Sequence, residues 1–172
     1  MTTRVSPHFT LEEFAVSGSH PGLVVPVPAI YVKNVRRLVA TVLQPMRDVL
    51  GRPVRVTSGY RSARLNRAVG GSKTSQHRRA EAADVTTGRE REVFRAMMLR
   101  PRPYPTGQVI VYPDRHFLHV ALPSPRYPEP TFCLHWPARG FDYRVLADVG
   151  ELDRLWPDPA TLYAPTDSEG VE

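Results

Sequence analysis

The most informative stretch of this chain spans residues 58–84 and reads SGYRSARLNRAVGGSKTSQHRRAEAAD. It begins where the alternating segment 54–58 ends, and such alternation predicts a half-buried strand. A loop and a short helix through residues 65–69 follow, and the next two residues are glycines that predict a turn. The stretch ends in a short apolar run, residues 82–85, which encloses one acid and predicts a second strand. It therefore predicts two strands that flank a short helix, a turn and a polar segment.

Three side chains in and after this stretch have the types expected of a zinc site. His77 and Asp84 are seven residues apart, and His119 follows on another predicted strand. Two imidazoles and a carboxylate leave the fourth position of a tetrahedral zinc ion for water, which is the catalytic arrangement. The alternative is that Asp84 is a buried carboxylate with satisfied hydrogen bonds and that the histidines are incidental. Spacing alone leaves both interpretations open.

Periodicity predicts the elements on both sides of this stretch. Residues 29–50 carry apolar side chains at three- and four-residue steps, which predicts an amphipathic helix that Pro45 should kink. Residues 89–99 predict a second helix, and residues 108–112 and 117–122 predict a hairpin. Helices and hairpins without a βαβ rhythm favour an α+β fold, in which a small antiparallel sheet has flanking helices.

Composition excludes several classes of protein. With 172 residues the chain can form one domain with a real core, and its single cysteine excludes a disulfide scaffold or a multi-cysteine zinc site. No apolar run is long enough for a transmembrane helix, and the N-terminus lacks the apolar segment of a signal peptide. The net charge of +6 comes without aromatic interleaving, so it does not favour nucleic acid as a partner.

The 18 prolines concentrate in the C-terminal half of the chain. This bias predicts two parts: residues 1–123, which include an N-terminal helical arm, and a proline-rich C-terminal extension, residues 124–172.

The order and spacing of the motifs closely resemble the zinc peptidases of the D-Ala-D-Ala carboxypeptidase type. These share a fold with the vancomycin-resistance dipeptidases, phage L-Ala-D-Glu endolysins and the Hedgehog signalling domain. The matching motifs are SGYRS at 58–62, then LNRAVGGSKTSQH at 65–77, then an aspartate after six further residues. FTLEEF at 9–14 and LQPMRD at 43–48 are similar to the family's N-terminal helices. The resemblance covers about residues 8–123 and implies a Hedgehog/DD-peptidase-like fold.

The resemblance also implies roles for individual residues. It implies one Zn²⁺ ion with three protein ligands: His77, Asp84 and His119. Arg61 matches the arginine that binds the scissile carbonyl and stabilises the oxyanion. Ser75 and Gln108 match residues that contact the substrate. This chain has Ala80 where the family usually has glycine, so the backbone there must be ordinary or strained.

The family's general base has no acidic counterpart here. One branch has glutamate three residues before the last histidine ligand, where this chain has His116. Another has it four residues after Gln108, where this chain has Tyr112. We predict His116 as the catalytic base because the unperturbed pKa of imidazole lies near neutrality. Asp114 and Glu81 are the alternatives.

The implied function is that of a zinc-dependent metallopeptidase that hydrolyses stem or cross-bridge peptides of peptidoglycan. A phage-type lysin, made in the cytoplasm and acting at the cell wall after release or within a virion, would need no signal peptide. The alternative is a catalytically weak or inactive protein of this fold that serves as a structural component of a phage or phage-like particle. Its partners would then be other phage structural proteins. The missing acids and the proline-rich extension favour this alternative.

Overall fold

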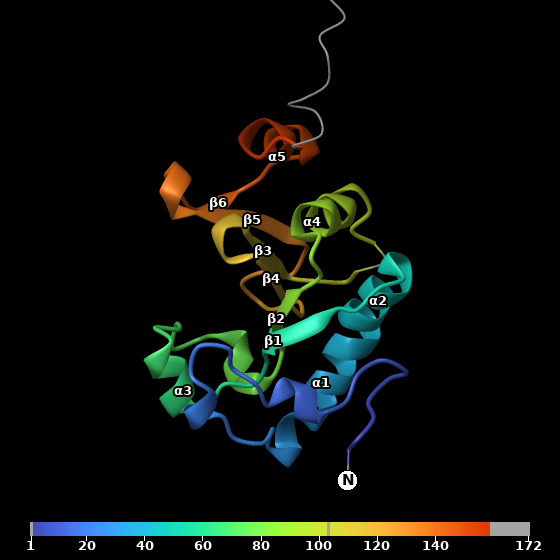
Figure 1. Ribbon diagram of the computed structural model, residues 1–172, viewed down its shortest axis with the longest axis vertical. Helices are drawn as coiled ribbons and strands as arrows, with labels where there is room; N and C mark the ends of the chain where they lie inside the picture. Colours follow the sequence, from blue (N-terminus) through green and yellow to red (C-terminus); the bar gives the residue numbers. More distant parts are fainter. Residues whose placement is uncertain (1, 103, 159–172) are drawn as a thin grey trace, which may run out of the picture.

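One six-stranded sheet runs through the computed structural model, which describes residues 2–102 and 104–158 (Figure 1). Its strands are β1 Arg55–Ser58, β2 Ala82–Thr86, β3 Gln108–Tyr112, β4 Phe117–Ala121, β5 Thr131–Trp136 and β6 Phe141–Val145. Their order across the sheet is β1-β2-β4-β3-β5-β6, and neighbours are antiparallel except for the parallel pair β3 and β5. The α+β class is confirmed, but the sheet is mixed, because a strand that the sequence did not predict, β5, adds alongside β3.

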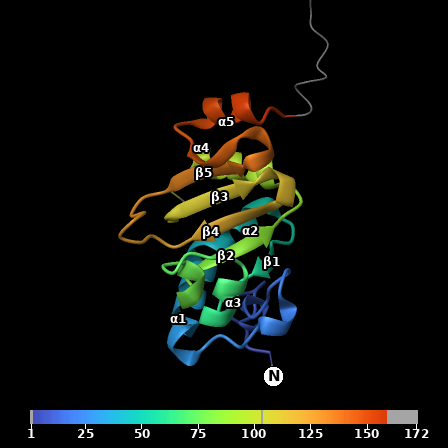
Figure 2. The same ribbon diagram turned by 90° about the vertical axis from the view of Figure 1, so that its left-hand side faces the viewer.

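The helices leave one face of this sheet partly open. They are α1 Val32–Leu38, α2 Gln44–Leu50, α3 Ala63–Ala68, α4 Glu90–Leu99 and α5 Val149–Leu155. Helices α1, α2 and α4 lie along one face of the sheet, whereas α3 lies on the other side (Figure 1). Figure 2 looks onto that other face, where the strands are visible above α3. No helix among the described residues combines the length and the apolar character that a membrane span requires.

Alternation along the central strands gives the two faces different chemistry. Val85 on β2 and Leu118 on β4 belong to the main hydrophobic core and have no exposed surface. Asp84 and His119, their neighbours along the strands, are partners across the β2–β4 ladder. Because successive side chains of a strand point to opposite faces, these two polar residues lie together on the open face. The core packing therefore fixes the position of the polar pair.

The predicted helix over residues 29–50 is continuous but not uniform. A short 3₁₀ turn, Ala29–Tyr31, leads into α1, and a π-helical turn, Val39–Leu43, joins α1 to α2. Pro45 lies in the first turn of α2. A proline cannot donate the usual bond to the carbonyl four residues before it, and the π turn absorbs this defect. The disturbance predicted at Pro45 is therefore present, as a change of helix type.

The described part of the predicted C-terminal extension is built into the same sheet. Strands β5 and β6 extend it beyond β3, and Leu134 and Leu152 are fully buried in the main core. Helix α5 packs against α4, where the Arg91 guanidinium donates to the Asp153 carboxylate at 2.6 Å. The rest of the extension, residues 159–172, lies outside the described residues.

Candidate metal centre

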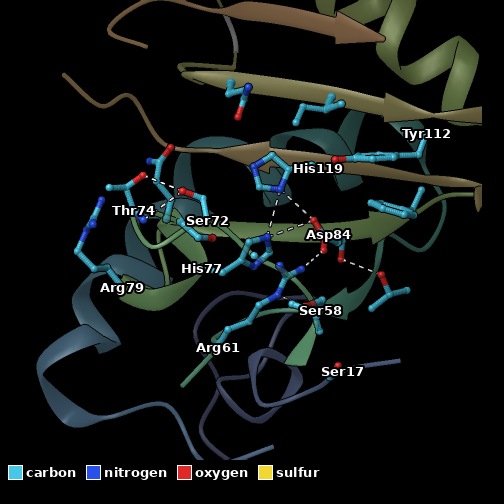
Figure 3. A pocket seen from close by; sticks show the side chains of 18 of the residues that line it. Ser17, Ser58, Arg61, Ser72, Thr74, His77, Arg79, Asp84, Tyr112 and His119 are labelled. Atoms are coloured by element: carbon cyan, nitrogen blue, oxygen red, sulfur yellow. Dashed lines mark hydrogen bonds and ion pairs between the residues drawn. The ribbon is translucent and has the colours of Figure 1, made fainter. Parts of the chain in front are cut away.

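Three separate segments bring His77, Asp84 and His119 together. Asp84 and His119 come from the paired strands β2 and β4, and His77 comes from the 3₁₀ turn Gln76–Arg79 that precedes β2. Figure 3 shows the two imidazoles one above the other, both facing the Asp84 carboxylate. Among the described residues, this is the one group of three or more potential ligands whose donor atoms converge.

The turn that places His77 depends on an unusual backbone at Ala80. This residue has a φ of 55° in the left-handed region and is 1% exposed. Its amide donates to the His77 carbonyl at 3.1 Å, which reverses the chain before β2 begins. The glycine usual in the family would adopt this conformation without a steric penalty, whereas alanine carries some strain. Because the chain reverses here, the side chain of His77 lies next to the carboxylate of Asp84, seven residues further along the chain.

The three donor atoms form a triangle of the size that zinc requires. The Asp84 Oδ1 atom lies 3.2 Å from His77 Nε2 and 2.9 Å from His119 Nδ1. The two nitrogens are 3.2 Å apart. Zinc bonds of about 2.0–2.2 Å at tetrahedral angles place neighbouring ligand atoms about 3.3 Å apart. The residues therefore fit a three-ligand zinc site with its fourth side facing the cavity.

Hydrogen bonding and burial prepare the ring of His77 for this role. Its Nδ1 atom lies 2.7 Å from the Gly59 carbonyl oxygen, to which it donates as N–H, so Nε2 carries the lone pair. Burial lowers the pKa of His77, although the charge of Asp84 acts in the opposite direction. The imidazole is therefore neutral at neutral pH, which is the form that binds a metal.

The Asp84 carboxylate is held ionised. Burial acts to raise its pKa, but the electrostatic interactions and hydrogen bonds of the carboxylate with His77 and His119 outweigh burial and hold the pKa well below its usual range. The Arg61 guanidinium also forms a short ion pair with Asp84 Oδ2, the oxygen that faces away from the triangle. Arg61 Nε donates to Ser58 Oγ at 2.9 Å, so β1 orients the guanidinium. A cation thus supports the carboxylate ligand from behind.

An open cavity of about 1260 Å³ lies over the three ligands. The residues predicted to contact the substrate, Ser75 and Gln108, line it, as does Arg61. Arginines dominate its charge: Arg61, Arg79, Arg115 and Arg126. Among the described lining residues Asp84 is the one carboxylate, and its charge is already committed to the cluster. The cavity is therefore suited to an anionic ligand.

The structure does not bring the predicted base to this cavity. His116 is exposed, has a φ of 53° on the turn between β3 and β4, and is not among the lining residues. Asp114 is exposed on the same turn, and Glu81 pairs with Arg79 at 2.7 Å. Neither acid lines the cavity. The catalytic role of His116 stays a prediction.

Three tyrosines that the sequence did not single out as site residues also line the cavity: Tyr112, Tyr127 and Tyr143. Tyr112 is the last residue of β3 and lies two residues after Ile110 and four after Gln108. This spacing indicates that all three side chains lie on one face of the strand. Tyr143 comes from β6, inside the predicted extension, and nothing in the sequence indicated that it reaches the site.

Comparisons with known proteins agree with this geometry. A family model described as Peptidase M15 matches residues 7–121, about two thirds of the chain. No curated protein matches the chain.

Proposed function

Because the chain belongs to the Peptidase M15 family, the zinc metallopeptidases of the D-Ala-D-Ala carboxypeptidase type, we propose that it hydrolyses stem or cross-bridge peptides of peptidoglycan. The observation that carries the proposal is the triangle of donor atoms from His77, Asp84 and His119, whose edges measure 2.9–3.2 Å at the floor of the cavity. When bound there, zinc would supply a Lewis acid that polarises the peptide carbonyl and activates water.

The chain's own residues prepare the site for a peptide. Gly59 fixes the tautomer of His77, and Arg61 holds Asp84 in place. We propose that Arg61 also shares the negative charge that develops on the carbonyl oxygen, because a fixed cation in a partly buried site stabilises such charge strongly. Ser75 and Gln108 would contact the peptide on either side.

The charge of the cavity supports a substrate with free carboxylates. Arg115, which precedes β4, and Arg126, which follows it in the chain, both line the cavity that holds the ligand His119. Peptidoglycan stem peptides carry free carboxylates along their length, and opposite charges favour encounter and fix register. A phage-type lysin, acting at the wall after release or as part of a virion, is the biological setting that we propose.

One observation favours a second candidate. Asp84 is the one carboxylate among the described lining residues, so a second acid that could serve as general base is not found there. This lack of a second acid agrees with a catalytically weak or inactive protein that binds wall peptide without cutting it. Such a protein would be a structural component of a phage or phage-like particle.

Two measurements test the proposal. Metal analysis of the purified protein should give about one zinc per chain, and the His77→Ala variant should lose it. Incubation with purified cell wall, followed by mass spectrometry of the released peptides, should identify the bond that is cut. Zinc binding without any released peptide would favour the structural candidate, and absence of zinc binding would contradict the peptidase.

A further inference from the structure

The side chain of Tyr112 lies on the face of the sheet that carries the three candidate metal ligands. Ile110 pairs with His119 across the β3–β4 ladder, and Tyr112, two residues further, pairs with Phe117. Residues two apart on a strand share a face, so Tyr112 is the next side chain along β3 beside the ligand His119. Figure 3 shows its phenol directed toward His119, on the side of Asp84 opposite to Arg61.

Packing fixes the ring of Tyr112. It stacks on Phe117 with ring centroids 4.3 Å apart and an angle of 18° between the planes. The Tyr143 ring meets it edge-on, at 6.5 Å and 86°. Only 8% of Tyr112 is exposed, so the packing around the ring leaves it little freedom to move.

Tyr143 reaches Tyr112 from the C-terminal strand pair through a strained backbone. Its φ is 53°, although it lies inside β6 and not in a turn. A bulky residue at positive φ is rare and persists where the surrounding structure requires its side chain in one place. The Tyr143 ring also packs on His135 of β5, with centroids 4.3 Å apart. The half-exposed Tyr143 ring thus contacts both His135 and Tyr112 at the edge of the cavity.

The chemistry of the Tyr112 hydroxyl is that of a donor. Burial raises its pKa, and a side-chain hydrogen bond with Tyr143 and the charge of Asp84 act in the same direction. The phenol is therefore protonated at neutral pH and cannot serve as a base. A neutral O–H beside the position of a reacting carbonyl can donate a hydrogen bond that strengthens as negative charge develops on the oxygen.

We propose that Tyr112 is a catalytic residue, which donates a hydrogen bond from its hydroxyl to the carbonyl oxygen of the scissile peptide bond, and that Tyr143 positions it. This inference rests on the proposed peptidase function. It gives the C-terminal strand pair a direct part in the site, because the positioning tyrosine comes from β6. No covalent bond to Tyr112 forms and its proton is not transferred.

The test compares Tyr112→Phe and Tyr143→Phe with wild type, using the wall peptide identified by mass spectrometry. Tyr104→Phe is the matched control, because Tyr104 is 5% exposed and does not line the cavity. Zinc content and thermal unfolding should be unchanged in all three variants. We expect kcat to fall about 100- to 1000-fold in Tyr112→Phe, the loss typical of one oxyanion donor, with KM nearly unchanged. Tyr143→Phe should show a smaller loss in kcat, and Tyr104→Phe none.

A binding measurement gives a readout that does not depend on turnover. A phosphinate analogue of the cleaved peptide imitates the tetrahedral, charged centre, and we expect Tyr112→Phe to bind it more weakly by a factor similar to the loss in kcat. Binding of the product peptide should not change. If the wild type cuts the peptide and the kcat of Tyr112→Phe lies within about twofold of the wild-type kcat, the role of Tyr112 is overturned, but the peptidase function is not. Failure of the wild type to cut any wall peptide would overturn the peptidase function and this inference with it. If Tyr112→Phe loses zinc, an unchanged kcat in Tyr143→Phe would overturn the positioning role and the proposal.

Discussion

Arg61 contacts one of the candidate metal ligands directly, because its guanidinium pairs with the Oδ2 atom of Asp84. It holds a ligand in place, and under the proposed function it would also face the substrate carbonyl. Partners that orient metal ligands commonly account for 10- to 100-fold in metal affinity. We expect Arg61→Ala to weaken zinc binding by roughly this factor, measured by competition with a chelator, and also to lower kcat.

The exposed Arg64 provides the control for this experiment, since it lies on α3 one turn away and does not line the cavity. Arg64→Ala should leave both zinc affinity and kcat unchanged. If Arg61→Ala retains full zinc affinity but loses turnover, Arg61 acts on the substrate alone and its contact with Asp84 is incidental.

His116 is the second residue whose role can be decided by one substitution. A general base contributes about 100- to 10,000-fold to turnover and must come within hydrogen-bonding reach of the water it activates. His116 is exposed on a turn outside the cavity lining, so from its position we expect His116→Gln to retain most of the wild-type kcat. A loss of a hundredfold or more, with zinc still bound, would instead establish the base that the sequence predicts.

At the scale of elements, Gly59 joins the N-terminal arm, β1 and the metal centre. A Cβ atom at this position would lie 2.3 Å from the Phe14 carbonyl oxygen and 2.6 Å from the Phe14 Cα atom. Both are backbone atoms, and Phe14 itself is fully buried, so the arm cannot move aside locally. The Gly59 carbonyl in turn accepts from His77. Glycine is required here for close approach of two backbones.

We therefore expect Gly59→Ala to destabilise the fold by about 1–3 kcal/mol, the usual cost of overpacking, and to lower zinc affinity as well. Denaturant unfolding and metal titration measure the two effects. Gly22→Ala is the control, because its Cβ would meet nothing within 4 Å. Wild-type stability in Gly59→Ala would mean that the arm is not rigidly docked against β1.

The elements that the sequence could predict are those with a local apolar pattern. Helix α4 and strands β1 and β4 alternate between more and less buried positions, whereas β2 and β3 are buried on both faces and appear in the sequence as short apolar runs. Strand β5 lies in proline-rich sequence, and β6 is mostly exposed, so neither shows a clear alternation. The parallel pairing of β3 with β5 is a long-range contact that no local pattern encodes.

The same distinction applies to the site. Motif order and spacing predicted the cluster of His77, Asp84 and His119, which converges as expected. The contact of Arg61 with Asp84 and the approach of Tyr143 depend on how strands far apart in sequence pack, and the residue types alone do not specify such contacts. His116 is exposed on the turn of the predicted hairpin, and the sequence did not indicate that its backbone would be left-handed there.

At the scale of the whole molecule, the boundary predicted after residue 123 falls inside one sheet. Strand β3 has β4 on one side and β5 on the other, so the sheet continues across the boundary without a break. The Phe132 ring of β5 packs edge-on against Phe94 of α4, with centroids 5.5 Å apart. The core therefore draws on both parts of the chain.

This continuity predicts that a chain ending at residue 123 does not fold into a stable unit. It would lose the buried side chains Phe132, Leu134, Leu146 and Leu152, and it would leave β3 as an unpaired edge with apolar neighbours, a state prone to aggregation. A milder test of the same prediction uses a point mutation in the full chain. Leu152→Ala, at a fully buried position on α5, should lower the free energy of unfolding in denaturant by about 2–5 kcal/mol. Leu99→Ala, at a position 56% exposed, should cost far less. Cooperative unfolding and zinc binding by the 1–123 chain would show that the last two strands are an accessory to the peptidase fold, and loss of both would show that they complete its core.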